Sequence, residues 1–140
     1  MGQASGNAFS LCVCYLPPGN SSRGDTSEEF FDALGSKITL YSDLGPMCIC
    51  GDFNARCGSK DDLGGVDSEI PDRYILDHTI NTHGQQLLDC LRATGLCMLN
   101  GRGDDDFTYV SVLGCSVVDY CLMSRDDFHS FSDFVVQCRE

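Results

Sequence analysis

Apolar residues occur along the chain in short runs, separated by polar stretches that are rich in glycine and aspartate. Runs of this length between turn-forming residues are typical of β-strands that are buried in a sheet. The first is residues 9–18, which end in a Tyr-x-Pro-Pro sequence, and the second is residues 47–50. Further strands are predicted near residues 96–99, 107–111, 117–123 and 133–137.

Two segments instead have the apolar spacing of a helix. Thr26 and Glu29 form a capping-box pattern, which predicts a helix from this point to about Leu40. Thr82 and Gln85 repeat the pattern and predict a second helix. Short strands with two helices laid on them predict an α/β (α+β) fold, in which β-sheets pack together and the helices lie outside. The apolar positions of the two helices are Phe30, Phe31, Leu34, Ile38, Leu87, Leu88 and Leu91.

The second strand leads into Gly-Asp-Phe-Asn, which contains Asp52 and Asn54. Residues two apart on an extended backbone point to the same side, so both side chains are expected to face one point beyond the strand. A carboxylate can bind a hard cation or accept a proton from water, and an amide can donate to a phosphoryl oxygen. The pair suggests metal-assisted attack on a phosphate ester, although Asp and Asn are also common turn formers.

Other motifs, in a fixed order along the chain, favour the catalytic interpretation. They are Tyr15 with Pro17-Pro18, residues 51–54, the segment around Thr108, and Ser116 to Tyr120. With these motifs the chain resembles the endonuclease/exonuclease/phosphatase (DNase I-like) superfamily, and within it the endonuclease domain of non-LTR retrotransposons. The resemblance runs from about Phe9 to the last residue. It implies a four-layer sandwich of two β-sheets with helices outside, and Mg²⁺-dependent (or Mn²⁺-dependent) hydrolysis of DNA phosphodiester bonds.

The resemblance also implies roles for five residues. Asp52 would orient or deprotonate the attacking water, or hold the metal ion through that water. Asn54 would hydrogen-bond the phosphate as its charge builds up. Tyr15 would donate its phenol to the phosphate or the leaving oxygen, but it could equally be a strand-end tyrosine that contacts water. Asp119 would accept a hydrogen bond from a catalytic His. Thr108 is predicted to be a strand residue, and the alternative is that it contacts the DNA backbone.

The superfamily also has a metal-binding Glu on an early strand and ends in a Ser-Asp-His motif. The Glu would precede Tyr15, and Ser132-Asp133-Phe134 is interpreted as the strand before the last motif. His129 precedes that strand and is not assigned as the catalytic base. We therefore expect residues 1–140 to be a single incomplete domain that is inactive or weakly active and loosely packed. The alternatives are a non-catalytic retrotransposon remnant, or a phosphatase or phosphodiesterase of the same superfamily.

Composition adds three expectations. The formal net charge of −12 predicts weak DNA binding by this chain alone, so a basic surface would come from elsewhere, for example an attached reverse transcriptase domain. The ten cysteines mostly lie in apolar runs and are predicted to be buried thiols rather than disulfides, with Cys57 and Cys138 as the exposed ones. No apolar run is long enough to span a membrane and no signal peptide is present, which favours an intracellular, nuclear or cytoplasmic protein that is not secreted.

Overall fold

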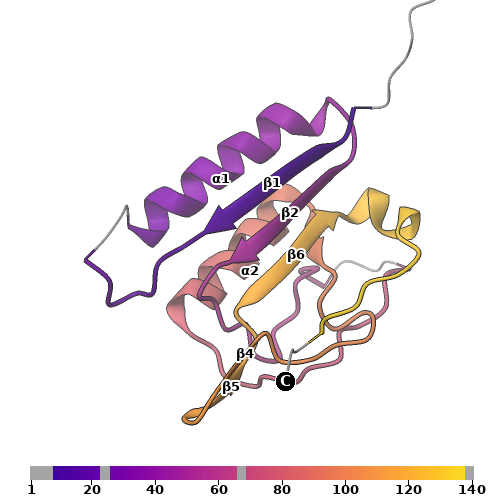
Figure 1. Ribbon diagram of the computed structural model, residues 1–140. Helices are drawn as coiled ribbons and strands as arrows, with labels where there is room; N and C mark the ends of the chain where they lie inside the picture. The colour runs from indigo at the N-terminus through magenta and orange to yellow at the C-terminus, as the bar shows by residue number, and fades with distance from the viewer. Residues whose placement is uncertain (1–7, 23–25, 66–68, 138–140) are drawn as a thin grey trace, which may run out of the picture.

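The centre of the computed structural model, which describes residues 8–22, 26–65 and 69–137, is a four-stranded β-sheet (Figure 1). Its strand order is β1-β2-β6-β3. β1 runs parallel to β2, and β6 runs antiparallel to β2 and to β3. The strands are β1 Ser10–Tyr15, β2 Met47–Asp52, β3 Leu96–Met98 and β6 Asp119–Ser124.

Two helices, α1 Ser27–Ser42 and α2 Thr82–Thr94, cover one face of this sheet. Their apolar sides pack on inward-facing strand residues such as Ile49 and Leu122, which are 1% and 0% exposed. This burial is the main hydrophobic core, and at about 25 cal/mol per Å² it supplies most of the driving force for folding. The helix residues in this core are Phe31, Leu34, Ile38, Leu87, Leu88 and Leu91, as the apolar spacing predicted.

The N-termini of the two helices differ in how well they were predicted. The capping box of α1 is confirmed: the Glu29 backbone N–H donates to Thr26 Oγ1 over 3.2 Å, and the Thr26 N–H donates to Glu29 Oε2 over 2.8 Å. The prediction for α2 was wrong by one residue, because Asn81 and not Thr82 caps the helix. Asn81 Oδ1 accepts from the Gly84 N–H over 2.8 Å and also from the Arg56 N–H, so a contact distant in sequence selects the cap.

A second, two-stranded sheet projects from the molecule (Figure 1). It is the hairpin of β4 Tyr109–Ser111 and β5 Gly114–Ser116. A short 3-10 helix, η1 Arg125–Ser130, follows β6. The predicted class, a mixed α/β fold with two sheets and helices, is confirmed. No helix in the described part of the chain is both long and apolar enough to cross a membrane.

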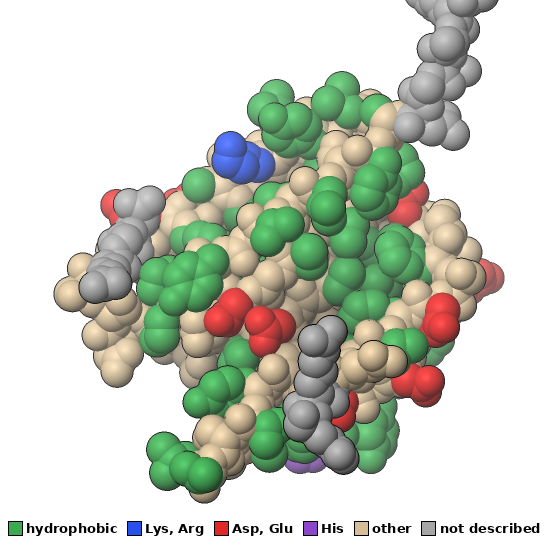
Figure 2. Space-filling model, in the orientation of Figure 1, with side chains coloured by type: hydrophobic (Ala, Val, Ile, Leu, Met, Phe, Trp, Pro, Cys, Tyr) green, Lys and Arg blue, Asp and Glu red, His purple; other side chains and the backbone are tan. Residues whose placement is uncertain are grey.

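The opposite face of the four-stranded sheet is covered only in part. Over β3 and β6, Leu63 and Ile70 of the long loop after β2 pack on Met123. Over β1, in contrast, Leu11, Val13 and Tyr15 are 63%, 74% and 64% exposed. Figure 2 shows the resulting gathering of apolar side chains over β1 and β2. One side of the sheet therefore ends in an uncovered apolar surface.

The long loop after β2 is fixed by a buried ion pair. Asp62 is 1% exposed, and Arg102 donates to both of its carboxylate oxygens over 2.8 and 3.0 Å. The Met98 backbone N–H donates to the same carboxylate over 2.8 Å. Asp62 lies in an Asp61-Asp62 pair whose sequence is typical of a solvated turn, but it is buried because an arginine 40 positions further along the chain neutralises it.

The predicted strand at 133–137 is absent from the structure. Only an isolated parallel bridge between Asp104 and Val135 forms there, since the partner at this edge is a loop and not a strand. Val135 remains 43% exposed.

The exposure of the cysteines differs in part from the prediction. Cys57 is 2% exposed because it packs in the main hydrophobic core, and among the described cysteines the exposed thiol is Cys115 on β5. Cys138 lies outside the described residues. His83, in the first turn of α2, is also buried, at 7% exposed.

Candidate active site

Three of the motif side chains form one row across the sheet. Tyr15 is the parallel partner of Asp52, and Asp52 is the antiparallel partner of Asp119. Directly paired residues on neighbouring strands, about 4.8 Å apart, point to the same face. The row therefore places a phenol and two carboxylates side by side on the face opposite the helices, at the ends of β1 and β2 and the start of β6. Figure 2 shows a pair of acidic side chains together at the edge of the apolar surface on this face.

A tight turn holds Asp52 and connects it to β1. Asp52 Oδ1 accepts from the Asn54 backbone N–H over 2.8 Å, the side-chain-to-backbone bond of an Asx turn. Asn54 has a φ of 46°, the left-handed region that Asn tolerates better than most residues. Asn54 Nδ2 donates to the Leu16 carbonyl over 2.8 Å, and the Leu16 N–H donates to the Asp52 carbonyl. One of the two amide N–H groups of Asn54 thus has a structural partner.

The second carboxylate, Asp119, has a raised pKa. Burial is the main cause, and the negative charge of Asp52 adds to it, while a hydrogen bond from Thr108 opposes both. Thr108 Oγ1 also accepts from the Val118 and Asp119 backbone N–H groups over 3.0 and 3.1 Å. Thr108 therefore positions the start of β6. The charge of Asp52 beside Asp119 is an arrangement that a bound cation would relieve.

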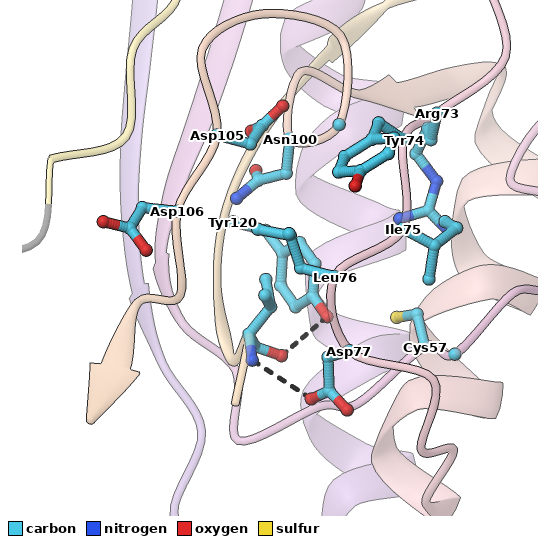
Figure 3. Close-up of a pocket in the computed structure, with 13 residues that line it drawn as sticks. Cys57, Arg73, Tyr74, Ile75, Leu76, Asp77, Asn100, Asp105, Asp106 and Tyr120 are labelled. Atoms are coloured by element: carbon cyan, nitrogen blue, oxygen red, sulfur yellow. Dashed lines mark hydrogen bonds between the residues drawn. The ribbon is translucent and has the colours of Figure 1, made fainter. Parts of the chain in front are cut away.

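A phenol below the row joins the segments that carry the two carboxylates. Tyr120 Oη lies 2.9 Å from the carbonyl of Ala55, just after Asn54, and 2.9 Å from the carbonyl of Val117, just before Asp119. Burial raises the pKa of Tyr120 well above its usual value, so the hydroxyl keeps its proton as a donor. Figure 3 shows the Tyr120 hydroxyl directed at this backbone.

Asp77 extends this support from the long loop. It accepts from the Val117 backbone N–H over 3.1 Å, also drawn in Figure 3, and from Arg56 over 2.7 and 2.8 Å. Burial by itself would raise the pKa of Asp77, but the hydrogen bonds from Arg56, Val117 and Thr79 outweigh it and hold the pKa below its usual value. The role of Asp77 was not predicted from the sequence, since Asp77 lies in a loop without apolar periodicity.

Asn100 was missed for a similar reason. Its Nδ2 donates to the Asp119 carbonyl over 3.1 Å, and its Oδ1 accepts from the Cys121 N–H over 2.9 Å. The residue is 5% exposed and braces the first residues of β6. A polar residue at the end of an apolar run, here after Leu99, is the one signal that could have identified it.

The pocket in Figure 3 lies next to this support and is not a substrate site. Its volume is about 30 Å³, room for roughly one water molecule. Asp105, Asn100 and Tyr120 line it, and the three residues of the row do not. Within the described ranges, no group of three or more His, Cys, Asp or Glu side chains is arranged to hold a metal ion. In the row itself, Asp52 and Asp119 are the two carboxylates that could contact a metal ion.

Comparison with known proteins identifies the family of this mixed α/β fold. Residues 9–138 match the model of the endonuclease-reverse transcriptase family, and the chain belongs to that family. The resemblance to the DNase I-like superfamily is thereby confirmed.

Six solved chains also match. One is the endonuclease domain of TRAS1, a telomere-specific non-LTR retrotransposon, at 21% identity and a TM-score of 0.45. The match covers 75% of this chain and 43% of that one, so the chain spans less than half the length of this solved domain. No curated protein matches the chain.

Proposed function

We propose that residues 1–140 form a single, incomplete domain. This domain is part of a Mg²⁺-dependent endonuclease that hydrolyses DNA phosphodiester bonds. The observation that carries the proposal is the row of Tyr15, Asp52 and Asp119, supplied by three strands. A phenol and two carboxylates in one row match the needs of phosphoryl transfer, in which a donor and a cation neutralise developing charge. Membership of the endonuclease-reverse transcriptase family supports the same reaction.

The residues of the row suit Mg²⁺, with Mn²⁺ as the substitute. Magnesium prefers oxygen ligands and is commonly held by one or two carboxylates together with waters and substrate phosphates. Asp52 and Asp119 provide two carboxylates on neighbouring strands, and a cation between them would offset their like charges. When bound, the ion would supply charge neutralisation at the phosphate.

Each side chain has a distinct task in this proposal. Asp52 orients or deprotonates the attacking water, directly or through the ion. The free N–H of the Asn54 amide donates to a phosphate oxygen. Tyr15, whose side chain is 64% exposed, donates its phenol to the phosphate or the leaving oxygen. Asp119 orients an imidazole that another part of the complete domain supplies, and Thr108 contacts the DNA backbone near the hairpin.

By itself the 140-residue chain is proposed to be inactive or weakly active. Two carboxylates without a substrate phosphate to complete the coordination shell should hold Mg²⁺ weakly, and the net charge of −12 repels DNA. DNA affinity would come from a reverse transcriptase domain in a longer polyprotein. An intracellular location, nuclear or cytoplasmic, fits a DNA substrate and the nine free thiols of the described residues.

A plasmid-nicking assay with Mg²⁺ tests the proposal. It compares this chain with a family-length domain that contains this sequence. In the longer domain, Asp52→Ala should lower nicking at least about 100-fold, whereas Asp133→Ala, an equal charge change at an exposed position, should leave it unchanged. Equal activity of Asp52→Ala and the parent would refute the site.

The two alternatives have outcomes of their own. A longer domain that is well folded but does not nick DNA under any metal condition would support a non-catalytic remnant. Strong Mg²⁺-dependent nicking by the 140-residue chain would refute the idea that it is inactive. Hydrolysis of small phosphate esters in preference to plasmid DNA would favour a phosphatase or phosphodiesterase.

A further inference from the structure

The N-termini of both helices border one pocket. It has a volume of about 310 Å³ and is lined by Gly19, Ser27, Asn81, Thr82 and His83. Ser27 and Thr82 are the first residues of α1 and α2. Small-molecule sites in proteins commonly have volumes of about 300–1,000 Å³. The pocket is built from residues 19–83 alone, so it is independent of the strands that a complete domain would add to the sheet.

Contacts with the turn after β2 fix the start of α2. Asn81 Nδ2 donates to the Asn54 carbonyl over 3.1 Å, and the Asn81 N–H donates to the Arg56 carbonyl over 3.0 Å. Gly84 permits this close approach, because a side chain there would collide with the Arg56 carbonyl. Both helices begin at the end of the sheet toward which β1 and β2 point (Figure 1). The pocket thus lies at the same end of the sheet as the row.

His83 is a buried polar side chain without a partner. It is 7% exposed, yet its imidazole makes no hydrogen bond or ion pair with any described residue. Buried polar groups are normally satisfied, and an imidazole has two nitrogens that donate or accept hydrogen bonds. A methyl group at Gly19 would lie 3.6 Å from His83 Nε2, so this nitrogen faces Gly19 in the pocket. The imidazole therefore points to a ligand there.

The first turn of α2 adds two backbone donors. The Asn81 side chain accepts from the Gly84 N–H, whereas the N–H groups of Thr82 and His83 have no partner in the described part of the chain. The hydroxyls of Thr82 and Ser27 are likewise unpaired among these residues. Unpaired N–H groups and the helix dipole favour an anion at such an N-terminus. The donors of the pocket therefore suit an oxyanion such as phosphate.

The charges around the pocket agree with an anionic ligand. No acidic side chain of the described residues lines it, although the chain has a net charge of −12. The first turn of α2 contains no acidic residue. The first turn of α1 contains Glu28 and Glu29, but Glu29 is held in the capping box and Glu28 lines the separate groove between the helices. The donors thus face a pocket to which α2 brings no negative charge.

We propose that Ser27, Thr82 and His83 form a phosphate-binding site, which holds a backbone phosphate of the DNA strand next to the phosphate at the row. The imidazole, the two hydroxyls and the two N–H groups of α2 would donate to its oxygens. Contacts of this kind fix the position of a nucleic acid without reading its sequence. The identity of the ligand rests on the proposed function, whereas the pocket and its donors rest on the fold alone.

Titrations of the 140-residue chain, followed through its amide NMR signals, test the pocket itself. At constant ionic strength, inorganic phosphate should shift the Thr82 and His83 signals until they saturate, whereas chloride should not. A thymidine trinucleotide without terminal phosphates supplies only backbone phosphates and should shift the same two signals. A response to inorganic phosphate alone would show that the pocket takes a free phosphate and would overturn the assignment to DNA.

Substitution of His83 tests the role of the imidazole. His83→Ala should weaken phosphate binding about tenfold, as expected for the loss of one hydrogen bond to a charged group. His83→Gln retains an N–H donor and should restore part of the affinity. His129→Ala, which changes an exposed histidine on η1, is the control and should bind like the parent. If His83→Ala does not fold, Gly19→Val serves the same purpose, because its methyl groups would fill the space beside Nε2.

Plasmid nicking by the longer domain separates this site from the row. His83→Ala should raise KM about threefold to tenfold and leave kcat within about twofold, since the residue positions the strand and does not touch the reacting atoms. Asp52→Ala should lower kcat but leave the phosphate-induced shifts of Thr82 and His83 intact. If Asp52→Ala nicks DNA like the parent while those shifts persist, the proposed function fails and the phosphate site stands.

Two outcomes would overturn the phosphate site. One is the absence of a saturable shift at the Thr82 and His83 amides with both phosphate probes. The other is equal phosphate affinity of the parent, His83→Ala and Gly19→Val, which would show that phosphate binds elsewhere on the chain.

Discussion

Asp52 and Asp119 lie directly opposite each other on β2 and β6, so two carboxylates share one rung of the sheet. Like charges in this position destabilise a sheet by roughly 0.2–1 kcal/mol. Burial raises the pKa of Asp119, and the charge of Asp52 adds to this rise. The fold thus carries an unfavourable contact at two of the residues that the sequence predicted to be catalytic.

Asp119→Asn should stabilise the chain at pH 7 by about 0.2–1 kcal/mol, because it removes the repulsion. The folded pKa of Asp119 is raised, so the parent loses stability as pH rises from the unfolded value of about 4 through the folded pKa. The gain should therefore be absent below about pH 4 and present at pH 7. Urea unfolding at both pH values measures it. A variant less stable than the parent at pH 7 would contradict the repulsion.

Tyr120→Phe should destabilise the chain by about 1–3 kcal/mol, because it removes the one phenol proton that the carbonyls of Ala55 and Val117 share. The ring itself stays in the core, so packing is preserved. Chemical denaturation gives the free energy of unfolding. Tyr109→Phe, an equal change on the exposed hairpin, serves as the control and should be neutral. Equal stability of the two variants would mean that the phenol does not join these segments.

Asp62→Ala should lower the free energy of unfolding by about 3–5 kcal/mol, more than Tyr120→Phe or Asp119→Asn. It leaves the Arg102 guanidinium, 2% exposed in its side chain, without a counter-charge. The long loop after β2 should also lose its protection from proteolysis, since Asp62 fixes it to β3 through the Met98 N–H. Asp72→Ala, in an exposed part of the same loop, is the matched control. Thermal unfolding and limited trypsin digestion provide the two measurements.

Cys115 should react with a thiol reagent far faster than the buried cysteines. It is the exposed thiol on β5, whereas burial raises the pKa of Cys57, Cys90 and Cys97 to about 11 and removes the reactive thiolate at neutral pH. In a Cys138→Ser background, Cys115→Ser should eliminate the fast phase of labelling at pH 7. Persistence of that phase would show that the strands open more readily than their burial indicates.

Local patterns in the sequence predicted much of the architecture. The capping box at Thr26 and Glu29 and the apolar face of α1 depend on residues within one or two turns of each other, and both are confirmed. The strand that ends at Asp52 was likewise evident from a short apolar run before a turn. In each case the determining contacts lie within a few residues along the chain.

The wrong predictions share one cause: in each, the residue or strand that determines the structure lies far away in the sequence. Asp62 pairs with Arg102, and Cys57 packs in the main core with residues of both helices. The contact with Arg56 favours Asn81 as the cap of α2. The segment at 133–137 has the composition of a strand but no neighbouring strand with which to form a ladder. A high β-propensity does not produce a strand when the tertiary structure places no neighbouring strand beside the segment.

The amino-acid sequence alone determined the family, because the order and chemistry of the motifs are written along the chain. Only the tertiary structure decided that Tyr15, Asp52 and Asp119 form one row, since strand register depends on pairing between segments such as those of Asp52 and Asp119, which are 119 − 52 = 67 positions apart. It also decided that β1 pairs with β2 at one side of the described sheet. Edges and registers arise from how strands meet, and no single strand encodes them.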